Sequence, residues 1–394
     1  MQYEPSASLP EPDKLSEEHS ARVREYVCAK IEQAGGQISF ADYMHEILYA
    51  PGLGYYNAGS SKFGPAGDFI TAPEVSSIFG TILARQVAEV LQQIDGASIL
   101  EFGAGSGKLA VDMLTALEGA DALPVSYQIL EVSADLQARQ KQRLWDALPH
   151  LMDRVQWLSE LPQDFEGVMV ANEVLDALPV ERFIRHKAEV LQSCVAVQSQ
   201  AFVWKTSPAS ERLSSAVANI EADLGEALAD GYTSEVSLAA PLWVSDLAKS
   251  LKRGAVFFFD YGVSRREYYA HDRSDGWLRC HYRHRAHNNP LINPGIQDVT
   301  SWVDFSAIAG AAIENGIELL GYQTQSQFLM GGGLEIELHG FAELSLKSQL
   351  ELSGQIKTLT LPGEMGENFK CLAVGRGDID TPSAFHFADR TQTL

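Results

Sequence analysis

"ILEFGAGSGKLAVDML", residues 99–114, is the stretch that decides the fold. Its first residues are apolar, as in a buried strand, and its last seven carry apolar residues at helical spacing. Between them lie three glycines, Gly103, Gly105 and Gly107. Glycine permits a tight turn and lets a ligand approach the backbone at the start of the following helix. The stretch therefore predicts a strand, a ligand-binding turn and a helix that begins near Lys108.

Three classes of ligand use such a turn, and single residues exclude two of them. The phosphate-binding P-loop, GxxxxGK[ST], requires glycine where this chain has Phe102 and a hydroxyl residue where it has Leu109. The dinucleotide fingerprint, GxGxxG, requires glycine at the position of Lys108. The remaining pattern, acidic-x-Gly-x-Gly-x-Gly from Glu101, resembles motif I of class I S-adenosylmethionine-dependent methyltransferases.

Short apolar runs alternate with helical segments outward from the turn. The predicted strands lie at 97–102, 125–132, 154–158, 167–172 and 254–262, with a closing pair at 317–325 and 368–376. Helices are predicted between the first three strands, at 108–119 and 134–148. Apolar strands that alternate with amphipathic helices indicate a parallel sheet covered on both faces. We expect an α/β fold with a doubly wound, Rossmann-like sheet.

Polar residues follow several of these strands. Glu131 ends the second strand, where an acidic residue binds the ribose hydroxyls of an adenosine ligand in doubly wound sheets. Glu101 is either a ligand to the amino group of the cofactor or a solvent-facing strand end. The residues expected at the carboxyl edge, where open α/β sheets bind ligands, are Asn172, Glu173, Asp176 and Asp260. Asp176 is equally compatible with an N-cap of a following helix.

Other segments are predicted to lie outside the sheet. A long helix is expected from Glu74 to about Asp95, opened by a capping box of Thr71 and Glu74. At least one of Asp68, Thr71 and Glu74 is also expected to contact the cofactor. The remaining segments are a hairpin over 189–206, a helix from there to Leu228, and a mainly helical insertion at 328–360.

These elements suggest four regions. Residues 1–95 form a helical segment that packs over the cofactor site, and 96–184 form the first part of the sheet. Residues 185–250 are the inserted hairpin and helix of an added, largely helical lobe. Residues 251–394 supply the second part of the sheet, with an active-site loop at 262–305.

The charge balance narrows the choice of partners. The chain has 394 residues and a formal net charge of -22, which argues against nucleic acid and favours a cationic partner. No apolar run reaches the roughly 18 residues that span a bilayer, and the start lacks the features of a signal or transit peptide. Four scattered cysteines without a CxxC pair fit a reduced compartment. We expect a cytoplasmic protein without membrane insertion.

Longer motifs extend the resemblance beyond the glycine turn. They are "GDFITAPEVSSIFG" (67–80), "ANEVLDALPVERF" (171–183), "DYG" (260–262), "CHYRHRAHNNPLINPGIQDVTSWVDF" (280–305) and "TQSQFLMGGG" (324–333). Together they resemble the MidA-like family of class I methyltransferases, whose mitochondrial members act as protein-arginine methyltransferases in respiratory complex I assembly. The resemblance implies a seven-stranded methyltransferase sheet with an added lobe. It also implies S-adenosylmethionine as cofactor and a protein substrate with an accessible arginine, a respiratory-complex subunit among the candidates.

The motif and the resemblance together assign roles to named residues. The expected cofactor-binding residues are Glu101, Gly103, Gly105, Gly107, Glu131, Asn172, Thr71 and Glu74, and no metal is expected. Carboxylates that make bidentate contacts can orient a guanidinium and concentrate its charge on the nitrogens that face them. The catalytic candidates of this kind are Glu173, Asp176 and Asp260, with Asp298 and Asp304 in the later loop.

Alternative functions stay open at this point. The chain could be a cofactor-binding assembly factor with little turnover or a methyltransferase that acts on a small molecule. A nicotinamide oxidoreductase is a more distant alternative, because the GxGxxG pattern fails. The oligomeric state is also open, and a homodimer is one of the options.

The stretch "CHYRHRAH", residues 280–287, is unusual in so acidic a chain. Cys280, His281, His284 and His287 have spacings seen in metal ligands, but a zinc site usually combines such a group with a second pair elsewhere, and the chain shows no such pair. Its position after "DYG" favours a family-specific segment that borders the active site. Direct substrate contact and a purely structural role remain equally compatible with the sequence.

Overall fold

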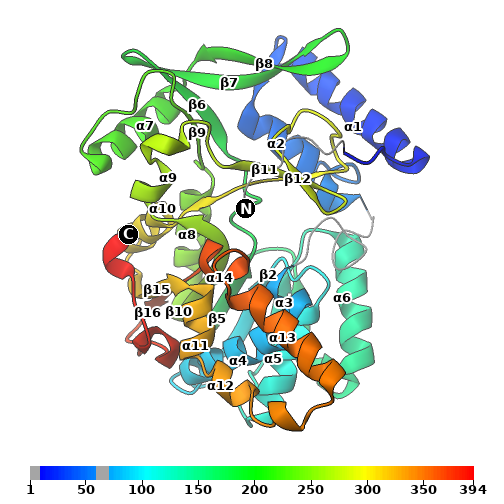
Figure 1. Cartoon of the computed structure of the whole chain (residues 1–394), viewed down its shortest axis with the longest axis vertical. Coiled ribbons are helices and arrows are strands. Elements are labelled where there is room, and N and C mark those ends of the chain that lie inside the picture. The colour runs from blue at the N-terminus through cyan, green and yellow to red at the C-terminus, as the bar shows by residue number, and fades with distance from the viewer. Residues whose placement is uncertain (1–8, 59–70) are drawn as a thin grey trace. The chain divides into compact units, whose positions relative to one another are not determined.

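The computed structural model describes residues 9–58 and 71–394, and the chain divides into two compact units (Figure 1). Unit 1 comprises Met1–Phe69, Asp176–Leu242 and Ser264–Asp304. Unit 2 comprises Ile70–Leu175, Trp243–Val263 and Phe305–Leu394. The chain alternates between them, so neither unit is one continuous region of sequence. Residues 70–95, which the sequence reading grouped with the N-terminal segment, belong to unit 2.

The main sheet lies in unit 2 and confirms the predicted doubly wound architecture. Seven of the eight strands of this sheet run in the order β15-β16-β10-β5-β2-β3-β4 along its main path. Their bounds are β2 (Ser98–Phe102), β3 (Tyr127–Leu130), β4 (Val155–Leu158), β5 (Phe165–Asn172), β10 (Leu251–Val263), β15 (Glu318–Thr324) and β16 (Phe369–Arg376). The pairs from β4 to β10 are parallel, whereas β16 is antiparallel to both of its neighbours. Strand order reverses between β2 and β5, and such a switch point is where open α/β sheets bind ligands.

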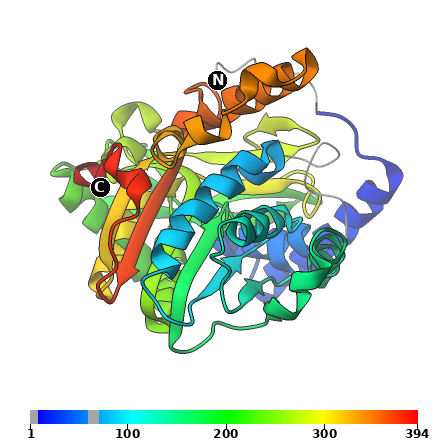
Figure 2. The ribbon, with the colours of Figure 1, turned by 90° about the horizontal axis from the view of Figure 1, so that it is seen from below.

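Helices cover both faces of this sheet (Figure 2). Two consecutive residues of β10 contact helices on opposite faces. The Phe259 ring contacts Phe79 of α4 (Ser77–Leu91), with ring centroids 5.1 Å apart. The neighbouring Phe258 ring contacts Trp243 of α8 (Ala240–Ser250), with centroids 6.2 Å apart. Side chains of successive strand residues point to opposite faces, so α4 and α8 lie on opposite sides. The apolar runs of the central strands are therefore buried from both directions.

The predicted long helix from Glu74 is wrong in one respect, because Ser76 divides it. The short α3 (Ala72–Val75) ends there and α4 begins at Ser77. Ser76 is extended, with φ -159°, and its hydroxyl accepts a hydrogen bond from the Ile78 amide at 3.4 Å. Serine hydroxyls that bind nearby backbone groups favour caps over helix interiors. The predicted capping box is also wrong, since among the described residues the Thr71 side chain makes no capping hydrogen bond.

Unit 1 contains two antiparallel sheets, which corrects the expectation of a largely helical lobe. The five-stranded sheet consists of β1 (Gln37–Ser39), β6 (Glu181–His186), β7 (Glu189–Gln198), β8 (Ala201–Pro208) and β9 (Thr233–Val236). The three-stranded sheet consists of β11 (Leu278–Tyr282), β12 (Arg285–His287) and β13 (Asp298–Ser301). Most of these strands are short, so their apolar periodicity is weak. The predicted hairpin over 189–206 is confirmed as β7 and β8.

Helices pack beside these sheets. In unit 1 they are α1 (Lys14–Gln33), α2 (Phe40–Tyr49), α7 (Glu211–Leu224) and α9 (Arg265–Tyr268). The α7 helix stops before Leu228 because Gly225 adopts a left-handed C-cap, with φ 76°. In unit 2 the remaining helices are α5 (Lys108–Gly119), α6 (Ala134–Ala147), α10 (Phe305–Glu314), α11 (Gln325–Gly331), α12 (Leu334–Glu337), α13 (Leu346–Thr360) and α14 (Met365–Asn368). None of the described helices has the length and apolarity required to cross a membrane.

Candidate cofactor site

The glycine turn of unit 2 joins β2 to α5 as predicted. Gly103, Gly105 and Gly107 all have positive φ angles, 58°, 52° and 82°, a backbone region that residues with a Cβ rarely adopt. Gly107 is the N-cap of α5, so the amide groups of the first helical turn lie next to this bend. A Cβ built on Gly107 would lie 3.2 Å from the Cα atom of Gln140. The missing side chain therefore lets α6 approach the turn closely.

Gln140 of α6 is a site residue that the sequence reading missed. Its side chain is fully buried, and its amide nitrogen donates to the Gly105 carbonyl and to the Glu131 carboxylate, each at 3.0 Å. Its amide oxygen accepts a hydrogen bond from the Trp157 indole at 3.0 Å. A signal was present, because Gln140 lies four residues from both Leu136 and Leu144 and shares their apolar face.

Glu131 lies directly after β3, as the ribose-binding interpretation requires. Its side chain is 6% exposed, and it accepts hydrogen bonds from Gln140 and from the backbone amide of Ser133, the latter at 2.9 Å. Ser133 is also the N-cap of α6. The carboxylate is thus held beside the glycine turn by two donors that come from different parts of α6.

Glu101 of β2 is buried, which excludes the alternative of a solvent-facing strand end. Only 2% of the residue is exposed, and its carboxyl accepts a hydrogen bond from the Tyr127 hydroxyl at 2.7 Å. Burial raises the pKa of the Glu101 carboxyl to about 7, the Tyr127 hydrogen bond opposes this shift, and the charge of Glu131 adds to it. The carboxyl group of Glu101 therefore changes its protonation state near neutral pH.

Asn172 and Glu173 mark the carboxyl end of β5. Among the described residues, the Asn172 side-chain oxygen is buried and accepts no hydrogen bond. Glu173 has a left-handed backbone, with φ 53°, and its amide donates to the Phe259 carbonyl at 2.8 Å. Such a conformation is strained in a residue other than glycine and is concentrated at functional sites.

The two aspartates that were grouped with Glu173 have different surroundings. Asp260 of β10 is 1% exposed, and its two oxygens accept hydrogen bonds from the amides of Leu175 and Tyr261, each at 3.0 Å. This carboxylate thereby ties the loop after β5 to the neighbouring strand. Asp176 belongs to unit 1, and the N-cap alternative for it is wrong because strand β6 is the next element.

Glu74 of α3 lies against the glycine turn. Its carboxylate accepts a hydrogen bond from the Ser106 hydroxyl and lies 3.5 Å from the Arg143 guanidinium of α6. Arg143 also donates to the Ser106 hydroxyl at 2.9 Å. These contacts explain why Glu74 does not close a capping box with Thr71. Asp68, the third candidate of this motif, lies outside the described residues.

These groups fit an adenosine cofactor that carries hydroxyl and amino donors. The three glycines leave the backbone at the start of α5 accessible at close range. Glu131 and Glu101 offer carboxylates, and the buried Asn172 oxygen requires a donor that the described residues do not supply. In residues 9–58 and 71–394, no three His, Cys, Asp or Glu side chains are grouped to hold a metal ion.

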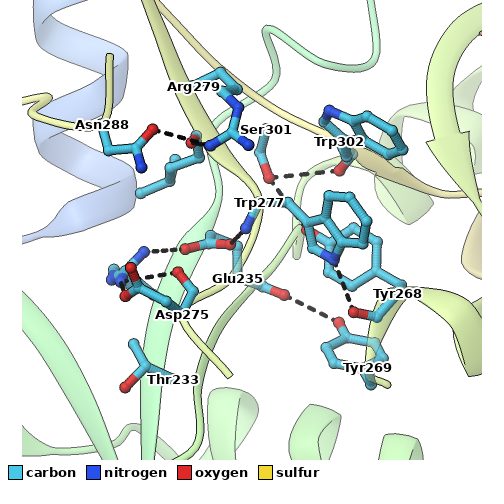
Figure 3. Close-up of polar contacts among 12 residues, drawn as sticks. Thr233, Glu235, Tyr268, Tyr269, Asp275, Trp277, Arg279, Asn288, Ser301 and Trp302 are labelled. Atoms are coloured by element: carbon cyan, nitrogen blue, oxygen red, sulfur yellow. Dashed lines mark hydrogen bonds and ion pairs between the residues drawn. The ribbon is translucent and has the colours of Figure 1, made fainter. Parts of the chain in front are cut away.

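The predicted active-site loop, 262–305, contributes a polar cluster to unit 1 (Figure 3). Trp277 stacks on Trp302, with ring centroids 4.3 Å apart, and its indole donates to the Tyr268 carbonyl at 2.7 Å. The Trp277 amide donates to Glu235 at 2.6 Å, and this fully buried carboxylate also pairs with Arg182. Because every partner lies within unit 1, these contacts stabilise the added lobe.

The histidine- and arginine-rich stretch forms a hairpin in unit 1. Cys280 of β11 pairs with His287 of β12, and Arg283 in the turn forms an ion pair with Asp13. Burial raises the pKa of the Cys280 thiol, and burial together with the nearby Arg279 charge lowers the pKa of His281 to about 4. Both groups are therefore uncharged at neutral pH.

Asp298 and Asp304, the later candidates for guanidinium binding, also have partners in unit 1. Asp298 accepts a hydrogen bond from the Tyr56 hydroxyl at 2.8 Å. Asp304 forms an ion pair with Arg265 at 2.9 Å. Both carboxylates therefore connect segments of the added lobe to one another.

Curated relatives resemble this chain over most of its length. It is 30% identical over 413 residues to the Drosophila melanogaster "Protein arginine methyltransferase NDUFAF7 homolog, mitochondrial", covering 95% of this chain and 89% of that protein. It is 29% identical over 371 residues to the Mus musculus protein of the corresponding name, covering 86% and 81%.

A solved structure from Burkholderia thailandensis, determined with bound S-adenosyl-homocysteine, shares 40% identity and a TM-score of 0.92, covering 98% of this chain and 100% of that one. A native crystal structure from the same organism shares 39% identity and a TM-score of 0.90, with the same coverage. The family described as "Putative S-adenosyl-L-methionine-dependent methyltransferase" matches residues 82–323, which is more than half of the chain. Because this match agrees with the sheet order, the glycine turn and the acidic strand ends, the chain belongs to the MidA-like family of S-adenosylmethionine-dependent methyltransferases.

Proposed function

We propose that this protein transfers a methyl group from S-adenosylmethionine to an arginine side chain of a protein substrate. The names of the curated relatives support an arginine acceptor, and the net charge of -22 favours a cationic partner over nucleic acid. The observation that carries the proposal is Glu173, a carboxylate-bearing residue held in a left-handed conformation at the carboxyl end of β5. Four free cysteines support a reduced compartment, and we propose the cytoplasm.

The cofactor residues in this proposal come from unit 2. Gly103, Gly105 and Gly107 admit the cofactor to the backbone, and Glu131 accepts hydrogen bonds from the ribose hydroxyls. The remaining cofactor residues are Glu101, Asn172, Thr71 and Glu74. Support comes from the buried acceptor on Asn172 and from the Glu74 contact to Ser106 in the turn.

The chemistry requires orientation more than covalent catalysis by the protein. S-adenosylmethionine supplies a methyl group that is already activated by its sulfonium. A guanidinium is a poor nucleophile, because its charge is delocalised and it does not readily lose a proton. We assign Glu173 to bind the guanidinium through two oxygens and to concentrate charge on the nitrogens that face it, which leaves the attacking nitrogen more nucleophilic. Asp176 is the second candidate for this contact, and Asp260 holds the loop that carries Glu173.

The test is methylation of a cell extract with isotope-labelled S-adenosylmethionine, followed by mass spectrometry. The wild-type protein is expected to label arginine on a protein, and Glu173→Gln is expected to lower the rate by 100-fold or more, roughly 3 kcal/mol of transition-state stabilisation. Glu118→Gln is the matched control, since Glu118 lies far along α5 and pairs only with His150 among the described residues. A labelled small metabolite in place of labelled protein would sink the arginine proposal and favour a small-molecule methyltransferase.

A cofactor-binding assembly factor is distinguished by a separate variant. Gly105→Val places a branched side chain at a positive φ in the turn and is expected to abolish cofactor binding. If methylation is the function, Gly105→Val loses activity while capture of the substrate protein is retained. Loss of capture together with the cofactor, without measurable turnover in the wild-type protein, would favour the assembly factor.

A further inference from the structure

Gln140 occupies the centre of a buried polar network that connects three separate segments of unit 2. It is 0% exposed, and it faces the sheet from the middle of α6. A buried amide without hydrogen-bond partners destabilises a folded protein. Gln140 has no such deficit, because each of its polar atoms has a partner. Position 140 is therefore a buried position that holds a fully hydrogen-bonded amide, although an apolar residue there would need no hydrogen-bond partners.

The partners determine which way the Gln140 amide points. The Trp157 indole can only donate a hydrogen bond, so the group 3.0 Å from it must be the Gln140 oxygen. The amide nitrogen then faces two acceptors, the Gly105 carbonyl and the Glu131 carboxylate, each at 3.0 Å. Lys141 lies 5.0 Å from the centre of the Trp157 ring and covers it. The orientation of the Gln140 amide is therefore fixed by its hydrogen-bond partners and not by packing alone.

Both hydrogen bonds that the Gln140 amide nitrogen donates go to groups assigned to cofactor binding. One oxygen of Glu131 accepts from the Ser133 amide at 2.9 Å and the other accepts from Gln140. Two donors from different directions hold the plane of the carboxylate, and each oxygen can accept more than one hydrogen bond. The Gly105 carbonyl is held by the same amide, and Gly107 packs directly on the Gln140 backbone. One side chain therefore sets the ribose-binding carboxylate and the glycine turn relative to each other.

We propose that Gln140, oriented by Trp157, is a positioning residue that holds the Glu131 carboxylate to receive the ribose hydroxyls and fixes the glycine turn beside it. The inference rests on the proposed cofactor site but not on the proposed arginine acceptor. In this proposal, the preference of the site for a ligand with a ribose 2′-hydroxyl depends on Gln140, a residue that does not itself touch the ligand.

Binding of S-adenosylhomocysteine to the full-length chain, measured by titration calorimetry without substrate, tests the proposal. Gln140→Met keeps the side-chain length but removes both donors, and it is expected to weaken binding roughly tenfold, as for a lost hydrogen bond to a charged group. Trp157→Phe keeps an aromatic ring but removes the indole N–H that orients the Gln140 amide, and a severalfold loss of affinity is expected. Gln142→Met is the matched control, because Gln142 is on the exposed side of the same helix and bonds to Asp146. This control is expected to bind as the wild type does.

A second ligand separates positioning from a general loss of structure. For the wild type, 2′-deoxy-S-adenosylhomocysteine is expected to bind roughly 10–100-fold more weakly than the parent compound, because a charge-assisted hydrogen bond to Glu131 is lost. In Gln140→Met this ratio is expected to fall below about threefold. Gln140→Glu is expected to bind poorly at pH 8, where two carboxylates face each other, and to recover partly at pH 6, where a protonated carboxyl can donate.

The outcomes are distinguishable. An unchanged 2′-hydroxyl ratio in Gln140→Met overturns the positioning role, even if overall affinity falls. A wild-type protein that binds S-adenosylhomocysteine without any preference for the 2′-hydroxyl also overturns it, while the cofactor assignment stands. Absence of binding to the wild type overturns the cofactor site itself. Tight binding with no methylated arginine leaves Gln140 supported and removes only the proposed acceptor.

Discussion

The buried carboxyl of Glu101 predicts a specific pH dependence of stability. Its pKa rises from 4.5 to about 7 in the folded protein, mainly through burial. The folded state therefore keeps a proton that the unfolded chain releases between these values. The stabilisation is complete below pH 4.5 and is lost as the pH rises through about 7. At about 1.36 kcal/mol for each pKa unit, the loss amounts to roughly 3 kcal/mol.

Glu101→Gln removes this titration and keeps the shape and the acceptor for the Tyr127 hydroxyl. The measurement is the free energy of unfolding in urea for the wild type and the variant at several pH values from 5 to 8. The free energy of unfolding of the variant minus that of the wild type is expected to increase by roughly 2–3 kcal/mol from pH 5 to pH 8, because only the wild type must bury a charge at pH 8. Contributions from all other titrating groups cancel in the difference.

Tyr127→Phe provides the matched perturbation. The tyrosine hydroxyl lowers the pKa of Glu101 by donating to its charged form. Its removal is expected to shift the pH window in which stability is lost to higher values. A difference between Glu101→Gln and wild type that stays constant from pH 5 to 8 would refute the reasoning, since it would mean that Glu101 is ionised in both states throughout.

Three further variants test other parts of the structure. Gly107→Ala is expected to reduce stability by about 1–2 kcal/mol and to weaken S-adenosylhomocysteine binding, because Gly107 has φ 82° and a Cβ there would press on α6. Thermal unfolding measures the first effect and calorimetry the second. Gly119→Ala is the control: a Cβ at Gly119 meets nothing within 4 Å, so this variant is expected to be neutral or slightly stabilising. Asp260→Asn replaces one carboxylate oxygen by an NH₂ group, so a backbone amide of the loop after β5 faces a donor in place of its acceptor. This variant is expected to lower the rate of methylation more than it lowers cofactor affinity. An equal loss of rate and affinity would contradict the role of Asp260 in holding the loop. Glu235→Ala is expected to destabilise the protein by about 1–3 kcal/mol, since it removes the buried acceptor of the Trp277 amide and leaves the partly buried Arg182 guanidinium with the exposed Asp275 as its ion-pair partner. A melting temperature unchanged by this substitution would contradict a structural role for the Glu235 carboxylate.

Several parts of the fold were predictable because they depend on local patterns. The strands of the main sheet are apolar runs between helical segments, and this pattern suffices to predict a covered parallel sheet. The added lobe was misread as largely helical because strands such as β6, "ERFIRH", carry charged residues along their length. Such strands are stabilised by pairing with distant neighbours, and pairing leaves little trace in local periodicity. The break at Ser76 was missed for a related reason, since its hydroxyl also bonds to Gln355 of α13.

The glycine turn, the acidic residues at the strand ends and the family of this protein were determined by the sequence alone. They could be identified because a positive φ and a strand end are properties of a few consecutive residues. The tertiary structure decided the surroundings of these residues: that Glu101 is buried against Tyr127, that Glu74 binds Ser106, and that Gln140 connects the turn to Glu131. Each of these contacts joins residues that are far from consecutive in the chain, and only the packing of helices against the sheet brings them within hydrogen-bonding distance.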